Sequence, residues 1–300
     1  MYNKSQKNRI TNLMRQFRVE DKARENALKP TMNSKDVVST ADFMFSPICP
    51  LDRVGDSGSL LLAKRKSNRA EQYLVKHEYC DCASNEFVYT KLAQAMGYKM
   101  PNVVLFEVSP SEKRKCFKTE YIIGAEYLNI IDNNPSFEKI REHAKNWKEY
   151  FGFLALYEMM EEGDSFETPF VDDGFIYRVD TTDSFIASEI YFAQAGINVE
   201  LNGIVPKAIM QEMFSESRID PEDALARYDC RLNALNEKYG NECVKPFLEP
   251  FERISDVKMD FIEDFLNTLC YFYPDYIGDY FKNYIVDLKN ISLDYLRGKQ

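Results

Sequence analysis

The sequence predicts an α+β fold with two lobes, a small strand-rich lobe followed by a larger and mostly helical one. Short apolar alternations typical of strands gather between about residue 48 and residue 124, and helical spacing of apolar residues dominates afterwards. A length of 300 residues suits one large domain or two modest ones. We therefore divide the chain into an N-terminal arm at 1–46, a strand-rich lobe at 47–124 and a helical lobe at 125–300.

Four strands and one helix are expected in the strand-rich lobe. The first two strands flank a basic polar link and predict a hairpin. A helix follows, because Ser84 is a suitable N-cap, Gly97 is a suitable stop, and apolar residues between them share one helical face. Gly124 then allows a bend. The expected ranges are 59–63 and 72–76 for the hairpin, 84–96 for the helix, and 103–108 and 116–123 for the other strands.

The helical lobe is expected to begin with one long amphipathic helix at 137–162. A short strand at 175–180 follows the turn 172–174. Three more helices are predicted at about 222–239, 256–272 and 276–297. Their many aromatic residues are interpreted as packing core.

Composition argues against several classes of protein. No run of about eighteen apolar residues occurs, so no membrane span or membrane partner is expected. The N-terminus lacks the apolar stretch of a secretory signal, which favours a cytoplasmic protein. The seven cysteines form no CxxC pair, so a disulfide framework or a structural zinc site is disfavoured. Because the chain has only two histidines, a Ser-His-Asp or multi-histidine mechanism is disfavoured.

The charge distribution bears on partners. The net charge of −10 argues against a protein that wraps nucleic acid. The N-terminal arm differs, since residues 1–25 carry seven basic residues against three acidic ones, with apolar residues at helical spacing. We expect the arm to be a helix on the domain or on a partner, with nucleic acid or an anionic surface as the less favoured alternative. The sequence gives no oligomeric state.

A strand lysine and a helix glutamate form the first candidate constellation. Lys76 closes the strand 72–76, and Glu86 follows ten positions later in the predicted helix. Alone, each has an ordinary explanation, since strand-end lysines are solvated and the first helical turn favours acidic residues. A turn of small residues precedes them, and turn, strand lysine and helix glutamate occur in this order in the nucleotide clamp of a kinase small lobe. The turn residues that would approach a phosphate are Gly55, Ser57, Gly58 and Ser59, although their spacing matches neither G-x-G-x-x-G nor Walker A.

The second candidate constellation is an acidic run from residue 158 to residue 183. It contains nine acidic residues and one basic residue, Arg178. A charge run is ordinarily a solvated face, but this one brackets an apolar segment, 175–179, that leads into Asp180. Clustered carboxylates repel one another unless cations neutralise them, and Mg²⁺ prefers such oxygen ligands. The run therefore predicts a magnesium site, and a nucleoside triphosphate would bring the ion.

These motifs resemble the HipA-like kinases, which belong to a wider set of atypical protein kinases. The resemblance covers roughly residues 50–185 and rests first on the strand that ends in Lys76 and on the helix pattern from Asn85-Glu86 to Gly97. Gly163-Asp164 and the later strand that ends in Asp180 are similar to the family's catalytic segment. The resemblance implies a two-lobed kinase-like fold that binds ATP and Mg²⁺ and phosphorylates serine or threonine hydroxyls of a protein substrate.

The resemblance also implies a role for the main candidate residues. Lys76 would hold the nucleotide phosphates, and Glu86 would pair with Lys76. Asp164 would orient or deprotonate the acceptor hydroxyl, and Asp180 would ligate Mg²⁺.

Residues 120–124, which include Glu120 and Ile122, would connect the two lobes, and their backbone would meet the adenine. The family's histidine and asparagine after the catalytic aspartate are absent from residues 165–169, so Glu167 or Asp172 would stand in as a metal ligand. Two alternatives therefore stay open beside an active kinase. One is a pseudokinase that binds nucleotide or partners without efficient catalysis, and the other is a non-kinase helical adaptor recruited through the basic arm.

Overall fold

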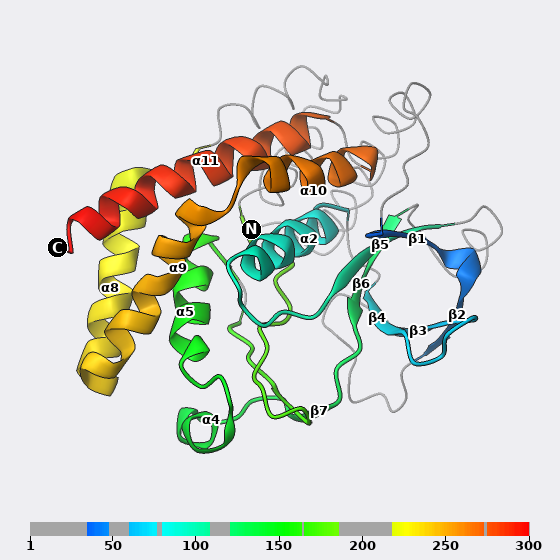
Figure 1. Cartoon of the computed structure of the whole chain (residues 1–300), viewed down its shortest axis with the longest axis horizontal. Helices are drawn as coiled ribbons and strands as arrows, with labels where there is room; N and C mark the ends of the chain where they lie inside the picture. Colours follow the sequence, from blue (N-terminus) through cyan, green and yellow to red (C-terminus); the bar gives the residue numbers. More distant parts are fainter. Residues whose placement is uncertain are drawn as a thin grey trace, which may run out of the picture.

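A strand-rich part precedes a helical part in the structure, which confirms the predicted α+β class (Figure 1). The computed structural model describes residues 35–47, 60–76, 80–108, 121–163, 165–185, 218–272 and 275–299. The N-terminal arm lies outside these residues, apart from its last part. None of the described helices is long and apolar enough to span a membrane.

Six strands form one mixed sheet in the order β1-β5-β6-β4-β3-β2. β1 runs parallel to β5, and all other neighbours are antiparallel. A 3-10 turn, Thr40–Asp42, joins the first two strands. The strands are β1 (Val37–Ser39), β2 (Phe43–Pro47), β3 (Leu61–Arg65), β4 (Gln72–Lys76), β5 (Val103–Glu107) and β6 (Tyr121–Glu126).

The predicted hairpin is confirmed, because β3 and β4 pair antiparallel across the polar link. The prediction that Gly124 bends the chain is wrong, since Gly124 lies inside β6. A Cβ atom there would come within 2.5 Å of the Phe106 ring and 3.1 Å of the Tyr73 Cβ. Glycine is therefore needed at this position for packing rather than for bending. The connection between sheet and helices starts after Glu126, so the hinge predicted at 120–124 is placed too early.

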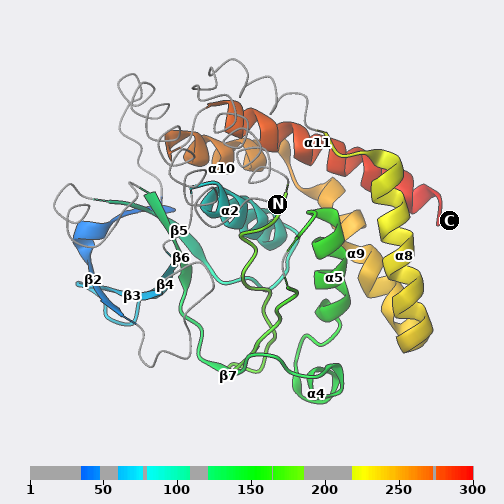
Figure 2. The same cartoon turned by 180° about the vertical axis from the view of Figure 1, so that it is seen from behind.

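The central helix α2 (Cys80–Ala95) lies between the sheet and the helical part. It packs on β5 and β6 on one side and on α10 on the other, as Figures 1 and 2 both show. The helix begins four residues before the predicted start, so Ser84 is a buried interior residue rather than the N-cap. Gly97 ends it with a φ of 85°, as predicted.

The long helix predicted at 137–162 is two helices in the structure. α4 (Phe137–His143) starts at an N-cap serine, Ser136, and α5 (Glu149–Met159) follows a turn. The side chain of Asn146 lies in that turn and bonds both main-chain groups of Ile176, with its Oδ1 2.9 Å from the nitrogen and its Nδ2 2.9 Å from the oxygen. The main-chain nitrogen of Lys145 also donates to the carbonyl of Gly174 at 2.9 Å, so it makes no helical hydrogen bond, and local periodicity does not show these long-range contacts.

The strand predicted at 175–180 is replaced by a single bridge between Phe170 and Ile176. A second, two-stranded sheet pairs β7 (Ile130–Asp132) with β8 (Phe170–Val171).

The predicted C-terminal helices are confirmed, and one further helix is present. Their bounds are α8 (Pro221–Tyr239), α9 (Val244–Asp256), α10 (Met259–Phe272) and α11 (Asp275–Arg297), with a 3-10 turn (Gly240–Cys243) before α9. The unpredicted helix is α9, which contains Pro246 and Pro250. Burial of Phe247, Phe251 and Ile254 on one helical face stabilises it against the unfavourable propensity of proline.

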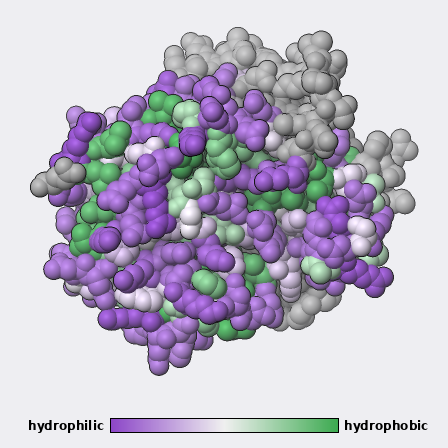
Figure 3. Space-filling view, in the orientation of Figure 1, coloured by the Kyte–Doolittle hydropathy of each residue, from purple (hydrophilic) through white to green (hydrophobic). Residues whose placement is uncertain are grey.

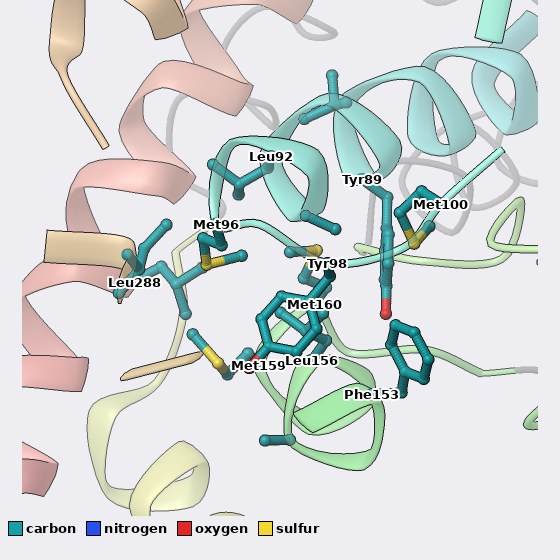
Figure 4. Packing of buried hydrophobic residues seen from close by; sticks show 14 of the residues in the cluster. Tyr89, Leu92, Met96, Tyr98, Met100, Phe153, Leu156, Met159, Met160 and Leu288 are labelled. Carbon is teal, nitrogen blue, oxygen red and sulfur yellow. The ribbon is translucent and has the colours of Figure 1, made fainter. Parts of the chain in front are cut away.

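Two hydrophobic clusters hold the fold together. The larger one joins α2, one face of the sheet and the C-terminal helices, and Figure 4 shows side chains of α2, α5 and α11 meeting in it. The smaller one lies on the other face of the sheet around Phe106 and Ile122. The molecular face seen in Figure 3 is mostly hydrophilic, with hydrophobic residues in separate patches.

Candidate functional site

The register of the sheet places the lysine end of β4 on the face that α2 covers. Lys76 is the last residue of β4 and is paired with Ile123 of β6. Paired residues of neighbouring strands share a face of the sheet. Ile123 is buried in the same cluster as α2, so the position of Lys76 belongs to this face. The side chain of Lys76 lies outside what the structure describes.

Glu86 is buried in the middle of α2, with 3% of its surface exposed. The eight residues of α2 from Ala83 to Thr90 are all buried, because the sheet and α10 enclose the helix. A carboxylate in such a place is stable only when it is paired or protonated. The predicted ion pair with Lys76 stays a prediction.

The neighbour of Glu86 connects α2 to the segment of Asp180. Asn85 donates a buried hydrogen bond of 3.0 Å from its Nδ2 to the carbonyl of Thr182. The Thr182 hydroxyl donates in turn to the Asp180 Oδ1 at 3.1 Å. Helix α2 and the Asp180 carboxylate are therefore two hydrogen bonds apart.

The segment that leads to Asp164 lies beside the segment that follows Asp180. The Gly163 amide donates to the carbonyl of Asp183 at 2.8 Å, and the Phe185 amide donates to the carbonyl of Met160 at 2.7 Å. Phe185 is anchored against Phe281 and Tyr284 of α11, with ring centroids 5.2 Å and 4.9 Å away. Asp164 itself lies outside the described residues, and its neighbour Gly163 is held beside the Asp180 segment.

Backbone strain is concentrated in this region. Among the described residues, the non-glycine residues with positive φ are Glu161 at 50°, Asp180 at 56° and Phe185 at 57°. Left-handed backbone is unfavourable for residues with a Cβ atom and persists only where surrounding contacts impose it. Such strain is typical of functional sites, and here it occurs shortly before Asp164, at Asp180 and at Phe185 in the segment that follows Asp180.

Arginines neutralise the first part of the acidic run. Glu158 pairs with Arg231 at 2.6 Å, and Glu161 pairs with Arg227 at 3.0 Å, both from α8. Glu161 also accepts a hydrogen bond of 3.0 Å from the Tyr284 hydroxyl. These carboxylates anchor the end of α5 to α8 and α11, so the counter-charge that the run requires here is guanidinium rather than a metal ion.

Glu162 pairs with Arg178, and both side chains are almost fully buried. Burial raises the pKa of the Glu162 carboxyl, and the charge of Arg178 opposes this shift. Burial likewise disfavours a charged Arg178, yet the charge of Glu162 holds the pKa of Arg178 above its ordinary value. We infer that both groups are ionised and stabilise each other.

The two predicted stand-in metal ligands are both exposed: Glu167 lies 3.4 Å from the Ser165 hydroxyl, and Asp172 accepts a hydrogen bond of 2.7 Å from the Asn129 side chain. Within the described parts of the chain, no group of three or more His, Cys, Asp or Glu side chains is arranged to hold a metal ion by protein ligands alone. Mg²⁺ is usually bound through one or two carboxylates together with phosphate oxygens, so Asp180 suits a shared site of that kind.

Other predicted site residues fall in the sheet or outside the described residues. Ile122 lies in β6, is 1% exposed and belongs to the smaller cluster, on the face opposite to Ile123. The remaining ones, Gly55, Ser57, Gly58, Ser59 and Glu120, lie outside the described residues.

Sequence reasoning missed Asn85, Thr182 and Arg178 as parts of the site. Asn85 stands next to Glu86 at a position that is 0% exposed. A buried amide needs hydrogen-bond partners, so a polar residue within an otherwise buried helix is a usable signal. Arg178 carried a similar signal, because it is the one base within an acidic run.

Comparisons with known proteins find similar structures but no sequence match. No protein-family model matches the chain, and no curated protein matches its sequence. Among solved structures, the chain is similar to the crystal structure of the proinflammatory kinase CtkA of Helicobacter pylori. The two share 9% sequence identity and a TM-score of 0.49, over 86% of this chain and 98% of that chain.

Proposed function

We propose that the protein is a phosphotransferase of the HipA-like kinase type, which uses ATP and Mg²⁺ to phosphorylate serine or threonine in a protein. The observation that carries the proposal is a junction of three segments. It contains α2 with Glu86, the left-handed turn at Asp180, and Gly163, which precedes Asp164. Phosphoryl transfer requires little covalent chemistry from the protein, so catalysis rests on bringing such groups together.

The nucleotide end of the site is formed by Lys76 and Glu86. Lys76 binds phosphate oxygens of ATP, and Glu86 holds Lys76 in place. Two observations support this pairing: the carboxylate of Glu86 is buried, and the register of β4 assigns Lys76 to the face that α2 covers. The small-residue turn at 55–59 is assigned to the phosphates by its place before β3 in the sequence.

The transfer end of the site is formed by Asp164 and Asp180. Asp164 orients the acceptor hydroxyl and accepts its proton. The bond between the γ-phosphorus and the bridging oxygen of ATP breaks, the hydroxyl oxygen bonds to phosphorus, and ADP leaves. Asp180 would hold Mg²⁺, because the Thr182 hydroxyl orients its carboxylate and hard cations prefer carboxylate oxygens. When bound, the ion neutralises charge on the phosphate oxygens.

Two substitutions test these assignments. Asp180→Asn removes the metal-binding charge and is expected to abolish Mg²⁺-dependent transfer from labelled ATP. Lys76→Ala is expected to weaken nucleotide binding measured by calorimetry. Asp173→Asn is the matched control, because it removes the same charge from the same acidic run at an exposed turn, where Asp173 accepts a hydrogen bond of 2.8 Å from the Tyr177 hydroxyl. Transfer at the wild-type rate in Asp180→Asn would rule out its role.

A thermal-shift measurement with ATP separates the three functions that the sequence left open. A ligand that binds the folded state raises the unfolding temperature. A rise in the unfolding temperature together with phosphate transfer supports the kinase. A rise without phosphate transfer to any protein identifies a pseudokinase. A chain that shows no response to ATP, with or without Mg²⁺, is a binding protein of another class.

A further inference from the structure

The buried guanidinium of Arg178 occupies the space between the two segments that carry the aspartates. Arg178 is 1% exposed and ranks among the largest fully buried side chains of the described residues. Taking a charge out of water is costly, and apolar residues of similar volume stabilise a core equally well or better. A buried arginine therefore calls for an explanation beyond stability.

On one side, Arg178 contacts residues before and after Asp164. It pairs with Glu162, two residues before Asp164. Its guanidinium lies over the ring of Phe166 at 5.1 Å, and its Nη1 donates to the carbonyl of Glu167 at 2.9 Å. The backbone that carries Asp164 is thus held at both ends by one side chain.

On the other side, Arg178 belongs to the segment of Asp180. It stands two residues before Asp180, and its Nη1 also donates to the carbonyl of Val179, the residue between them. The planar guanidinium offers five donors in a fixed arrangement, so these contacts define a geometry as well as an attraction.

Tyr89 of α2, one turn after Asn85, lies close enough to the same ion pair to feel its charges. Tyr89 is fully buried, and burial together with the charge of Glu162 raises the pKa of its hydroxyl well above the ordinary value. Figure 4 shows the Tyr89 side chain extending from α2 towards Phe153 of α5. Arg178 and Glu162 therefore join the Asp164 segment to the Asp180 segment near Tyr89 of α2.

We propose that Arg178 is the positioning residue that sets the Asp164 and Asp180 segments in register for phosphoryl transfer. The proposal rests on the proposed function for its catalytic consequence. The contacts of Arg178 with the two segments, which we call the clamp, do not require the protein to be active. Loss of Arg178 leaves Lys76 and Glu86 in place, so it lowers kcat rather than nucleotide affinity. A misplacement of about 1 Å in an active site costs on the order of 100-fold in rate.

Arg231 of α8, which pairs with a carboxylate of the same acidic run, provides a matched control. It pairs with Glu158, and its guanidinium lies over the Tyr157 ring at 5.7 Å, so its contacts are of the same kind as those of Arg178. It is 38% exposed and joins α8 to the end of α5. Arg231→Met therefore removes an equivalent arginine without touching the proposed clamp.

The experiment compares Arg178→Lys, the double variant Glu162→Met/Arg178→Met, and Arg231→Met. Because the double variant removes both buried charges together, we expect it to remain folded. A denaturation curve checks that it does. We expect kcat to fall about 100-fold in the double variant, with KM for ATP within about threefold of wild type. Arg178→Lys keeps a positive charge at this position and should therefore retain more of the wild-type kcat than the double variant. Arg231→Met should keep the wild-type kcat. A folded double variant with wild-type kcat would overturn the proposal.

Amide hydrogen exchange tests the clamp separately from catalysis. In the double variant we expect exchange at least about tenfold faster in both 162–167 and 179–185, and in Arg231→Met a change confined to the end of α5. If the wild-type protein transfers no phosphate, the proposed function fails while exchange still decides on the clamp. Exchange that stays at the wild-type rate in both segments would show that Arg178 does not hold them.

Discussion

Two arginines in this molecule make the same contacts in opposite surroundings. Arg65 of β3 pairs with Glu71 at 2.6 Å and lies over the Phe43 ring at 4.6 Å. Arg178 pairs with Glu162 and lies over the Phe166 ring at 5.1 Å. The side chains of the first pair are 23% and 30% exposed, whereas those of the second are 1% and 2% exposed.

The difference shows how burial changes the meaning of an ion pair. Water screens the pair on the hairpin, so it contributes at most about 1 kcal/mol and tolerates movement. The inner pair has lost its hydration, so each charge depends on the other and on fixed hydrogen bonds. The Arg65–Glu71 pair therefore places little constraint on its surroundings, while the Arg178–Glu162 pair holds the junction of the Asp164 and Asp180 segments in one geometry.

Arg178→Met alone should have the largest effect on stability, about 3–5 kcal/mol, because it leaves the Glu162 carboxylate buried without its counter-charge. Urea denaturation measures the loss. The double variant with Glu162→Met should recover most of it, since both charges are then replaced by apolar side chains. If the single and double variants are equally unstable, lost packing rather than charge explains the effect.

The part of the sheet around Arg65 is held by close packing of side chains, and Gly124→Ala tests this packing. The added Cβ atom would lie 2.5 Å from the Phe106 ring, which packs on Phe43 beneath Arg65 with centroids 5.0 Å apart. Overpacking of this kind costs about 1–3 kcal/mol. In a Phe106→Leu background the same substitution should cost less, and a double-mutant cycle by denaturation measures the coupling. Equal costs in the two backgrounds would show that the ring is not the obstacle.

Local patterns predicted the elements whose determinants are local. Alternation and a polar link predict the hairpin β3-β4, and Gly97 predicts the end of α2. Long-range contacts decide the failures. The predicted long helix is interrupted where the main chain of Lys145 bonds Gly174 and the side chain of Asn146 bonds Ile176, thirty residues away from it. Helix α9 forms despite Pro250 because the core buries one of its faces.

The candidate site was predicted in the same partial way. The order of Lys76, Glu86 and the two aspartates is visible in the sequence, but the contact that joins them is not. Asn85 and Thr182 are 97 residues apart, and nothing local pairs them. The acidic run suggested metal ions because the arginine that neutralises Glu158, Arg231, lies 73 residues later in α8.

The smallest expected effect on stability belongs to the Arg65–Glu71 pair on the hairpin. Arg65→Met should cost at most about 1 kcal/mol at pH 7, since both groups are partly exposed. The pH dependence then separates charge from packing. The hydrogen bond from Arg65 lowers the pKa of Glu71 below its ordinary value near 4.5. An acid whose pKa is lowered by folding stabilises the protein above its unfolded pKa and loses this contribution as the pH falls through the folded value.

Wild type and Arg65→Met should therefore approach equal stability in denaturation curves recorded at decreasing pH, because protonation of Glu71 below its lowered pKa removes the attraction. A gap that stays constant from pH 7 downward would assign the contribution of Arg65 to its contact with Phe43, because that contact does not titrate. A gap that closes assigns it to the ion pair. Arg178 should behave differently, since its hydrogen bonds to the Glu167 and Val179 carbonyls remain when a carboxylate is protonated.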